Sequence, residues 1–193
     1  IVAALVLECT LILSINIVRD RINGYYRKLL VFPISRSSIM LGCIIPLVYK
    51  TVVPIWFLFG CLYLIGINTA TGIGGFMLIN LLVIIAGIGF SCMGLMFAMI
   101  SKDESIFFAL LSFFKLPLTL LTYGFYPASF APKWLTAIAQ YNPLTYLIIP
   151  IRSLMVENAI NWVQFWNCTG ILCIFSLISF LVSYLIFNRS YAL

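Results

Sequence analysis

Long runs of apolar residues alternate with short polar stretches along most of this chain. A membrane-spanning helix needs about 20 mainly apolar residues to cross a hydrocarbon core about 30 Å thick. Five of the runs approach or exceed that length, so we predict an all-α polytopic membrane protein with a single transmembrane domain over residues 1–193. The predicted spans are residues 1–18, 38–66, 76–100, 105–124 and 167–187.

The predicted spans differ in character. Residues 38–66 form a run too long to cross upright, and Pro46 and Pro54 within it predict a kinked or tilted helix. The third span has a surface of small residues that lets a neighbouring helix approach closely, made by Gly87, Gly89, Ser91 and Gly94. The first span is short and begins at Ile1 without a methionine, so we expect some residues to be missing upstream.

Residues 125–166 have a different pattern from the spans. They combine aromatic residues and four prolines with apolar runs too brief to cross a membrane. Such runs are typical of re-entrant or interfacial helices, and Trp134, Trp162 and Trp166 suit the headgroup boundary. A plain surface loop is the alternative interpretation.

Composition supports lipid as the solvent of this chain. Only 8% of the residues are charged and 64% are hydrophobic, with a mean hydropathy of +1.16. Soluble domains are about a quarter charged. The net charge of +6 alone would suit a nucleic-acid partner. Nearly half of the cations, however, lie in one loop between apolar runs, so we predict a membrane protein with no nucleic-acid partner.

That loop, residues 19–37, fixes the predicted orientation. Loops rich in lysine and arginine remain on the cytoplasmic side, so we expect this loop and, by alternation, the C-terminus to be cytoplasmic in the cell membrane. Its aromatic and aliphatic residues interleave with cations, which favours an amphipathic helix at the membrane surface or against a partner. A charged loop that only anchors topology is the alternative. The five basic residues are Arg19, Arg21, Arg27, Lys28 and Arg36.

Three ionisable residues fall within predicted spans: Glu8, Lys50 and Lys115. Each costs about 2.5–3.5 kcal/mol at the bilayer centre on insertion scales, so each is expected to face protein or water. They are candidates for lining a polar path or for pairing with one another. Snorkelling toward an interface is the alternative.

The residue inventory argues against catalysis and against metal binding in this chain. Histidine is absent, Glu8 is the sole acid within a span, and no nucleophile is accompanied by a base. The six cysteines form no CxxC pair and are expected to pack as small apolar residues. No GxxxxGK[ST] motif occurs within the 193 residues, so ATP would have to be bound by a separate subunit. A channel is a weaker hypothesis, because no ring-forming polar motif is visible.

Two stretches, in order, resemble the permease subunits of type-2 ATP-binding-cassette exporters, which move drugs, lipids or polysaccharide precursors outward. The first consists of Asp20-Arg21, Gly24, Arg27 to Leu30, Pro33 to Arg36 and Leu41-Gly42. The second consists of Tyr126-Pro127, Pro132 to Leu135, Asn142 to Tyr146 and Arg152. The chain departs from the family pattern at Cys43, where the family has lysine.

The resemblance implies a six-span permease of which this chain lacks the first span. It implies a cytoplasmic coupling helix that docks on an ATP-binding-cassette ATPase, and outer re-entrant helices that gate the exit. The coupling residues would be Asp20, Arg21, Gly24, Tyr25, Arg27, Leu29, Leu30, Pro33 and Arg36. The gate residues would be Pro127, Pro132, Trp134, Asn142, Pro143, Tyr146 and Arg152.

The same resemblance implies the partners. ATP and Mg²⁺ would be held by the ATPase subunit, with no cofactor in this chain. A second permease copy or a homologue would complete the export path, surrounded by membrane lipid. The alternative function is a non-transporting membrane scaffold or assembly protein of similar topology.

Overall fold

A computed structural model describes residues 1–25, 36–66, 71–122, 133–156 and 161–190. All regular elements in these ranges are helices, which confirms the predicted all-α class. The helices are α1 (Val2–Leu13), α2 (Ile15–Ile22), α4 (Arg36–Leu64), α5 (Gly72–Ile100), α6 (Glu104–Leu120), α7 (Lys133–Ala139), α8 (Pro143–Val156) and α9 (Trp162–Ser190).

Four helical stretches within the described residues are long and apolar enough to cross a membrane. They are Val2–Ile22, Ser37–Leu64, Gly72–Ile100 and Trp162–Arg189. They correspond to four of the five predicted spans. The predicted span at residues 105–124 corresponds to α6, which has 17 residues and ends at Leu120, shortly after its internal Pro117. Because α6 is shorter than a typical span, the fifth crossing stays a prediction.

The start of the basic stretch is helical. Helices α1 and α2 follow one another with a single break at Ser14, whose hydroxyl donates to the Thr10 carbonyl at 2.7 Å. A serine bonded back to the preceding turn in this way bends a helix without ending it. Arg19, Asp20 and Arg21 therefore continue the first membrane helix, although the sequence pattern placed them in a loop.

The last long helix also begins earlier than predicted, at Trp162 and not at residue 167. Asn161 caps it, since the Asn161 Oδ1 atom accepts from the backbone N–H of Gln164 at 3.2 Å. Trp162 and Trp166 thus belong to α9 and not to the predicted re-entrant region. The hydropathy pattern placed this boundary too late because Gln164 is polar. The backbone hydrogen bonds of a helix form regardless of the polarity of the side chains.

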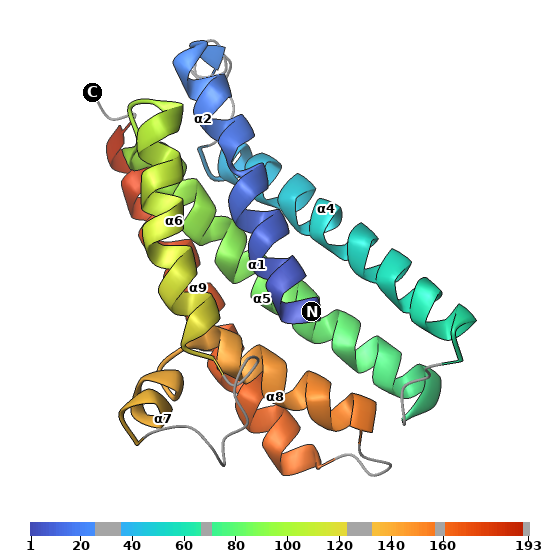
Figure 1. The fold of residues 1–193 in the computed structure, drawn as a ribbon. Coiled ribbons are helices and arrows are strands. Elements are labelled where there is room, and N and C mark those ends of the chain that lie inside the picture. The colour runs from blue at the N-terminus through green and yellow to red at the C-terminus, as the bar shows by residue number, and fades with distance from the viewer. Residues whose placement is uncertain (26–35, 67–70, 123–132, 157–160, 191–193) are drawn as a thin grey trace.

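Helix α5 is the centre of the bundle. It packs against α1, α4, α8 and α9, as Figure 1 shows. Two-thirds of its most apolar stretch (67%) is buried, against 22% for the corresponding stretches of α4 and α9. Its sequence is apolar on all sides, which is typical of a helix surrounded by other helices.

Glycines on α5 allow its neighbours to approach closely. A Cβ atom on Gly94 would lie 2.1 Å from the Ser14 hydroxyl oxygen, and one on Gly89 would lie 2.7 Å from the Phe175 ring. Serines of α9 add hydrogen bonds, because Ser176 donates to the Ile85 carbonyl at 2.7 Å and Ser183 donates to the Cys92 carbonyl. The predicted small-residue surface is therefore confirmed as the contact surface of α5.

We expect Gly94→Val to separate α1 from α5, because the added methyl groups would overlap Ser14. Overpacking of this kind costs about 1–3 kcal/mol, so the thermal unfolding midpoint in detergent should fall clearly. The matched control is Gly60→Val on α4, where a Cβ atom meets nothing within 4 Å. Equal losses in the two variants would contradict the assigned contact.

Candidate functional site

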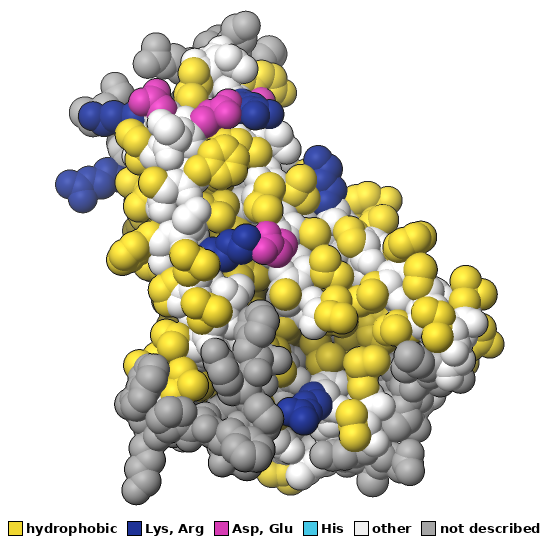
Figure 2. Space-filling model, in the orientation of Figure 1, with side chains coloured by type: hydrophobic (Ala, Val, Ile, Leu, Met, Phe, Trp, Pro, Cys, Tyr) yellow, Lys and Arg dark blue, Asp and Glu magenta, His cyan; other side chains and the backbone are white. Residues whose placement is uncertain are grey.

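Charged residues gather at the end of the bundle that holds α2 and the start of α6 (Figure 2). The Arg19 Nε atom donates to the Glu104 carboxylate at 2.8 Å. Arg21 donates to the backbone carbonyls of Ser101 at 3.0 Å, of Ala98 at 3.3 Å and of Met99. Residues 19–21 therefore share an end of the bundle with the turn before α6.

Arg21 serves the fold at this end. The last carbonyls of a helix have no partner within the helix, and a cation near them is favoured by the helix dipole. Arg21 meets both needs for the C-terminus of α5. Asp20, the neighbouring predicted coupling residue, is exposed. The two residues thus differ in availability to a partner protein, because the Arg21 guanidinium is already occupied.

The ion pair between Arg19 and Glu104 is exposed at the surface. The hydrogen bond from Arg19 lowers the pKa of the Glu104 carboxyl, so both groups remain charged at neutral pH. Their side chains are 55% and 41% exposed, and solvent screens such a pair strongly. Its main effect is therefore to set the position of α2 beside α6.

Gly24 ends α2. Its φ of +71° lies in the left-handed region that favours glycine, and its N–H bonds back to the Arg21 carbonyl at 3.0 Å. The side chain of Tyr25, next in sequence, is 52% exposed. Four predicted coupling residues, Arg27, Leu29, Leu30 and Pro33, lie outside the described residues, and Arg36 is the first residue of α4. The coupling helix itself therefore stays a prediction.

Two of the three ionisable residues in the spans meet each other. Lys115 of α6 and Glu8 of α1 form an ion pair of 2.5 Å, with side chains 26% and 36% exposed. Figure 2 shows one such pair of opposite charges within a largely hydrophobic face. Of the roles left open by the sequence, pairing is the one observed, and lining of a path by these residues stays a prediction.

Lys50, the third ionisable residue, borders a groove between the α1–α2 helix and α4. The groove has a volume of about 390 Å³. It is lined by Leu13, Asn16, Ile17, Asp20, Tyr25, Ser38, Ile39, Gly42, Cys43, Pro46, Leu47 and Lys50. The sequence indicated Asp20 and Tyr25 as coupling residues and Lys50 as an ionisable residue within a span. It did not bring all three together, because the groove exists only where the α1–α2 helix and α4 lie side by side.

The opposite end of the bundle holds α7 and α8 (Figure 1). Asn142 is buried there, and its Nδ2 atom donates to the Leu118 carbonyl of α6 at 2.8 Å. Its Oδ1 atom accepts from the Leu144 N–H at 3.0 Å, and Pro143 is the first residue of α8. An asparagine cap followed by proline is a favoured helix start, and Asn142 and Pro143 mark the boundary between α7 and α8.

The other predicted gate residues are distributed over this end. The Tyr146 hydroxyl donates to the Gln140 carbonyl at 2.7 Å, closing the turn between α7 and α8. Arg152 is exposed on α8, and Trp134 lies in α7 with a side chain outside the described part. Pro127 and Pro132 are outside the described residues. Their role as a gate stays a prediction.

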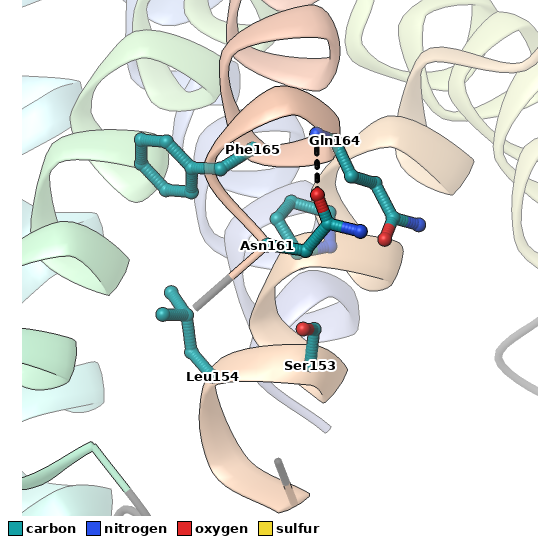
Figure 3. A pocket seen from close by; sticks show the side chains of 6 residues that line it. Ser153, Leu154, Asn161, Gln164 and Phe165 are labelled. Carbon is teal, nitrogen blue, oxygen red and sulfur yellow. Dashed lines mark hydrogen bonds between the residues drawn. The ribbon is translucent and has the colours of Figure 1, made fainter. Parts of the chain in front are cut away.

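A small cavity lies where α8 meets α9. Ser153, Leu154, Asn161, Gln164 and Phe165 surround it (Figure 3). Its volume is about 10 Å³, which is room for about one water molecule. It is therefore a packing gap and not a ligand site.

Comparison with known proteins bears on the two sequence motifs. Residues 1–156 match the profile of the family described as ABC-2 type transporter. The chain belongs to this family. The match runs from α1 through α8 and includes both motifs, which confirms the resemblance seen in the sequence. Together with the apolar helices, it makes the chain a multi-pass membrane protein of a transporter family.

Curated relatives agree with the family assignment. A protein of Cyanophora paradoxa named "Putative transport permease ycf38" is 28% identical over 76% of this chain and 50% of its own length. The protein of the same name from Pyropia yezoensis is 25% identical over 85% of this chain and 57% of its own length. The chain thus spans about half the length of these relatives. No solved structure matches it.

We expect Glu8 and Lys115 to depend on each other energetically. Glu8→Gln or Lys115→Met alone leaves one charge unpaired within a span, which costs up to about 3 kcal/mol on insertion scales. The double variant removes both charges and should unfold in detergent at a higher temperature than either single variant. Arg19→Gln with Glu104→Gln, which removes the exposed pair, should change the midpoint little. Simple addition of the two single losses in the double variant would contradict the coupling.

Substitution of Asn142 should separate its two bonding roles. Asn142→Ser keeps a good helix cap but is too short to reach α6, whereas Asn142→Ala loses both contacts. Loss of a cap costs about 1 kcal/mol, so the alanine variant should be less stable than the serine variant by about this amount. Thermal unfolding in detergent measures the difference. Equal stability of the two variants would show that the cap contributes nothing.

Proposed function

We propose that this chain is the transmembrane subunit of an ATP-driven exporter. In this proposal it forms part of the export path for a drug, lipid or polysaccharide-type substrate. The observation that carries the proposal is the match of residues 1–156 to the ABC-2 type transporter family. Because the 193 residues contain no phosphate-binding GxxxxGK[ST] loop, ATP would be bound and hydrolysed by a separate ATPase subunit with its Mg²⁺.

The proposed docking segment is residues 19–37. Its first residues are attached to the bundle mainly through Arg21, which holds the C-terminus of α5, while Arg19 pairs at the surface with Glu104 at the start of α6. A force applied by an ATPase to this segment would therefore reach the central helix directly. Aromatic and leucine side chains such as Tyr25 and Leu29 would fill an apolar groove of the ATPase, and Asp20 would help to fix the register.

The proposed exit lies at the opposite end, near α7 and α8. Asn142 joins the start of α8 to the end of α6, and α8 also packs against α5 and α9. Movement of the membrane helices would thus be transmitted to α8. In this scheme the basic loop and the C-terminus are cytoplasmic, following the bias of cations toward the inner side, and α8 faces outward.

A second permease copy or a homologue completes the proposed exporter. Among the described residues, only 22% of the most apolar stretches of α4 and α9 is buried, which leaves both helices apolar surface for a partner. Within the described residues α5 is the most buried of the long apolar helices, so the centre of this bundle is packed. A path for a bulky substrate would therefore form between two subunits.

Co-purification tests this proposal and separates a transporter from a membrane scaffold. We expect an ATPase of the ATP-binding-cassette class to co-purify with the chain and to change its turnover when bound. Leu29→Glu and Leu30→Glu should weaken that association at least about tenfold, which corresponds to about 1.4 kcal/mol at a binding hot spot. Lys102→Gln, an exposed change in the turn at the same end, should leave it unchanged.

The readouts are the amount of ATPase retained and export of a labelled substrate from vesicles. If both persist in Leu29→Glu and Leu30→Glu, the coupling assignment is wrong. If no ATPase associates with the unmodified chain, the scaffold function replaces the exporter.

A further inference from the structure

The groove between the α1–α2 helix and α4 has the dimensions of a ligand site. Its volume of about 390 Å³ lies within the range of about 300–1,000 Å³ usual for small-molecule pockets. It extends along α4 from Ser38 to Lys50, which corresponds to about 18 Å at the rise of an α-helix. Leu13, Ile17 and Leu47 contribute apolar wall, so the groove is suited to an elongated molecule that is largely apolar.

Lys50 gives this groove its chemistry. It lies near the middle of α4, about 21 Å from Arg36 at the rise of an α-helix, and its side chain is exposed. Among the described residues no carboxylate forms an ion pair with Lys50, whereas Lys115, the other lysine within a predicted span, is paired with Glu8. An uncompensated cation within a membrane span is costly, and such a residue is by default a candidate functional site.

A second copy of the chain is poorly suited to supply a carboxylate that would pair with Lys50. Glu8 is the sole acid within the predicted spans, and Lys115 already occupies it. Asp20 borders the groove but belongs to α2, at the end where Arg19 meets Glu104. Its carboxylate would repel an anion at that end and so favour an anion positioned at Lys50. The arrangement therefore favours a negatively charged ligand over a protein partner.

We propose that this groove binds an amphiphile with one anionic group, a phosphate or a carboxylate, which Lys50 recognises. The apolar body of the amphiphile would lie along Ile17, Ile39 and Leu47. The inference rests on the proposed function, because it names the class of cargo that the exporter takes up. Lys50 is then the residue that selects anionic over neutral or zwitterionic amphiphiles.

A native cysteine reports on occupancy of the groove. Cys43 lines it, whereas Cys173 is exposed on α9 and is absent from its lining. The chain in nanodiscs of neutral lipid is treated with a maleimide, and labelling of each cysteine is followed by peptide mass spectrometry. Dodecyl phosphate is the probe, used below its micelle-forming concentration, and dodecylphosphocholine is the zwitterionic control with the same alkyl chain.

We expect dodecyl phosphate to slow labelling of Cys43 and to leave Cys173 unchanged. Lys50→Gln removes one charge-assisted contact, so the concentration for half-protection should rise about tenfold. Lys50→Arg should retain protection, and Lys102→Gln, which removes a cation outside the groove, should behave as the unmodified chain.

Three results would overturn the proposal: equal protection by dodecylphosphocholine, equal protection by inorganic phosphate alone, and unchanged protection in Lys50→Gln. The first two need no variant and so do not depend on its folding. Binding is measured without an ATPase, so the result is independent of the co-purification test. If Cys43 is protected but no ATPase co-purifies with the chain, the proposed binding site is supported and the proposed exporter function is rejected.

Discussion

The close approach of α1 and α9 to α5 is the constraint on which this structure depends. Lipid is as apolar as the helix surfaces, so the hydrophobic effect does not press helices together in a membrane, and close packing with hydrogen bonds must do so. Gly94 leaves room for Ser14 between α1 and α2, Gly89 leaves room for Phe175 of α9, and Ser176 donates to the backbone of α5. The other features of the molecule are arranged around the helix that these contacts enclose.

A charged side chain within a membrane is energetically costly, so each one calls for a partner or a function. Arg21 satisfies the end of α5, and Glu8 compensates Lys115, so these charges have a structural explanation. Lys50 has none among the described residues and borders the groove. The contrast between two lysines within predicted spans, one paired with a carboxylate and one not, points to Lys50 as the residue whose role lies outside the fold.

The sequence predicted the helical class, the position of the long apolar helices and the transporter family, because hydropathy and short motifs are read from neighbouring residues. It misplaced helix ends. Arg19 continues a helix and Trp162 begins one, since backbone hydrogen bonds extend through polar residues that hydropathy assigns to loops. It also gave α6 more residues than the helix has, and Pro117 near its end is consistent with the shorter helix.

The sequence by itself therefore determined the membrane character of this protein, its helical class and its family, all of which follow from local composition and short motifs. Only the tertiary structure decided that Lys115 meets Glu8, that Arg21 caps α5, and that Asp20 and Lys50 border one groove. These partners lie on different helices. Their meeting depends on the rotation and depth at which each helix packs against α5, and no local pattern encodes those two quantities.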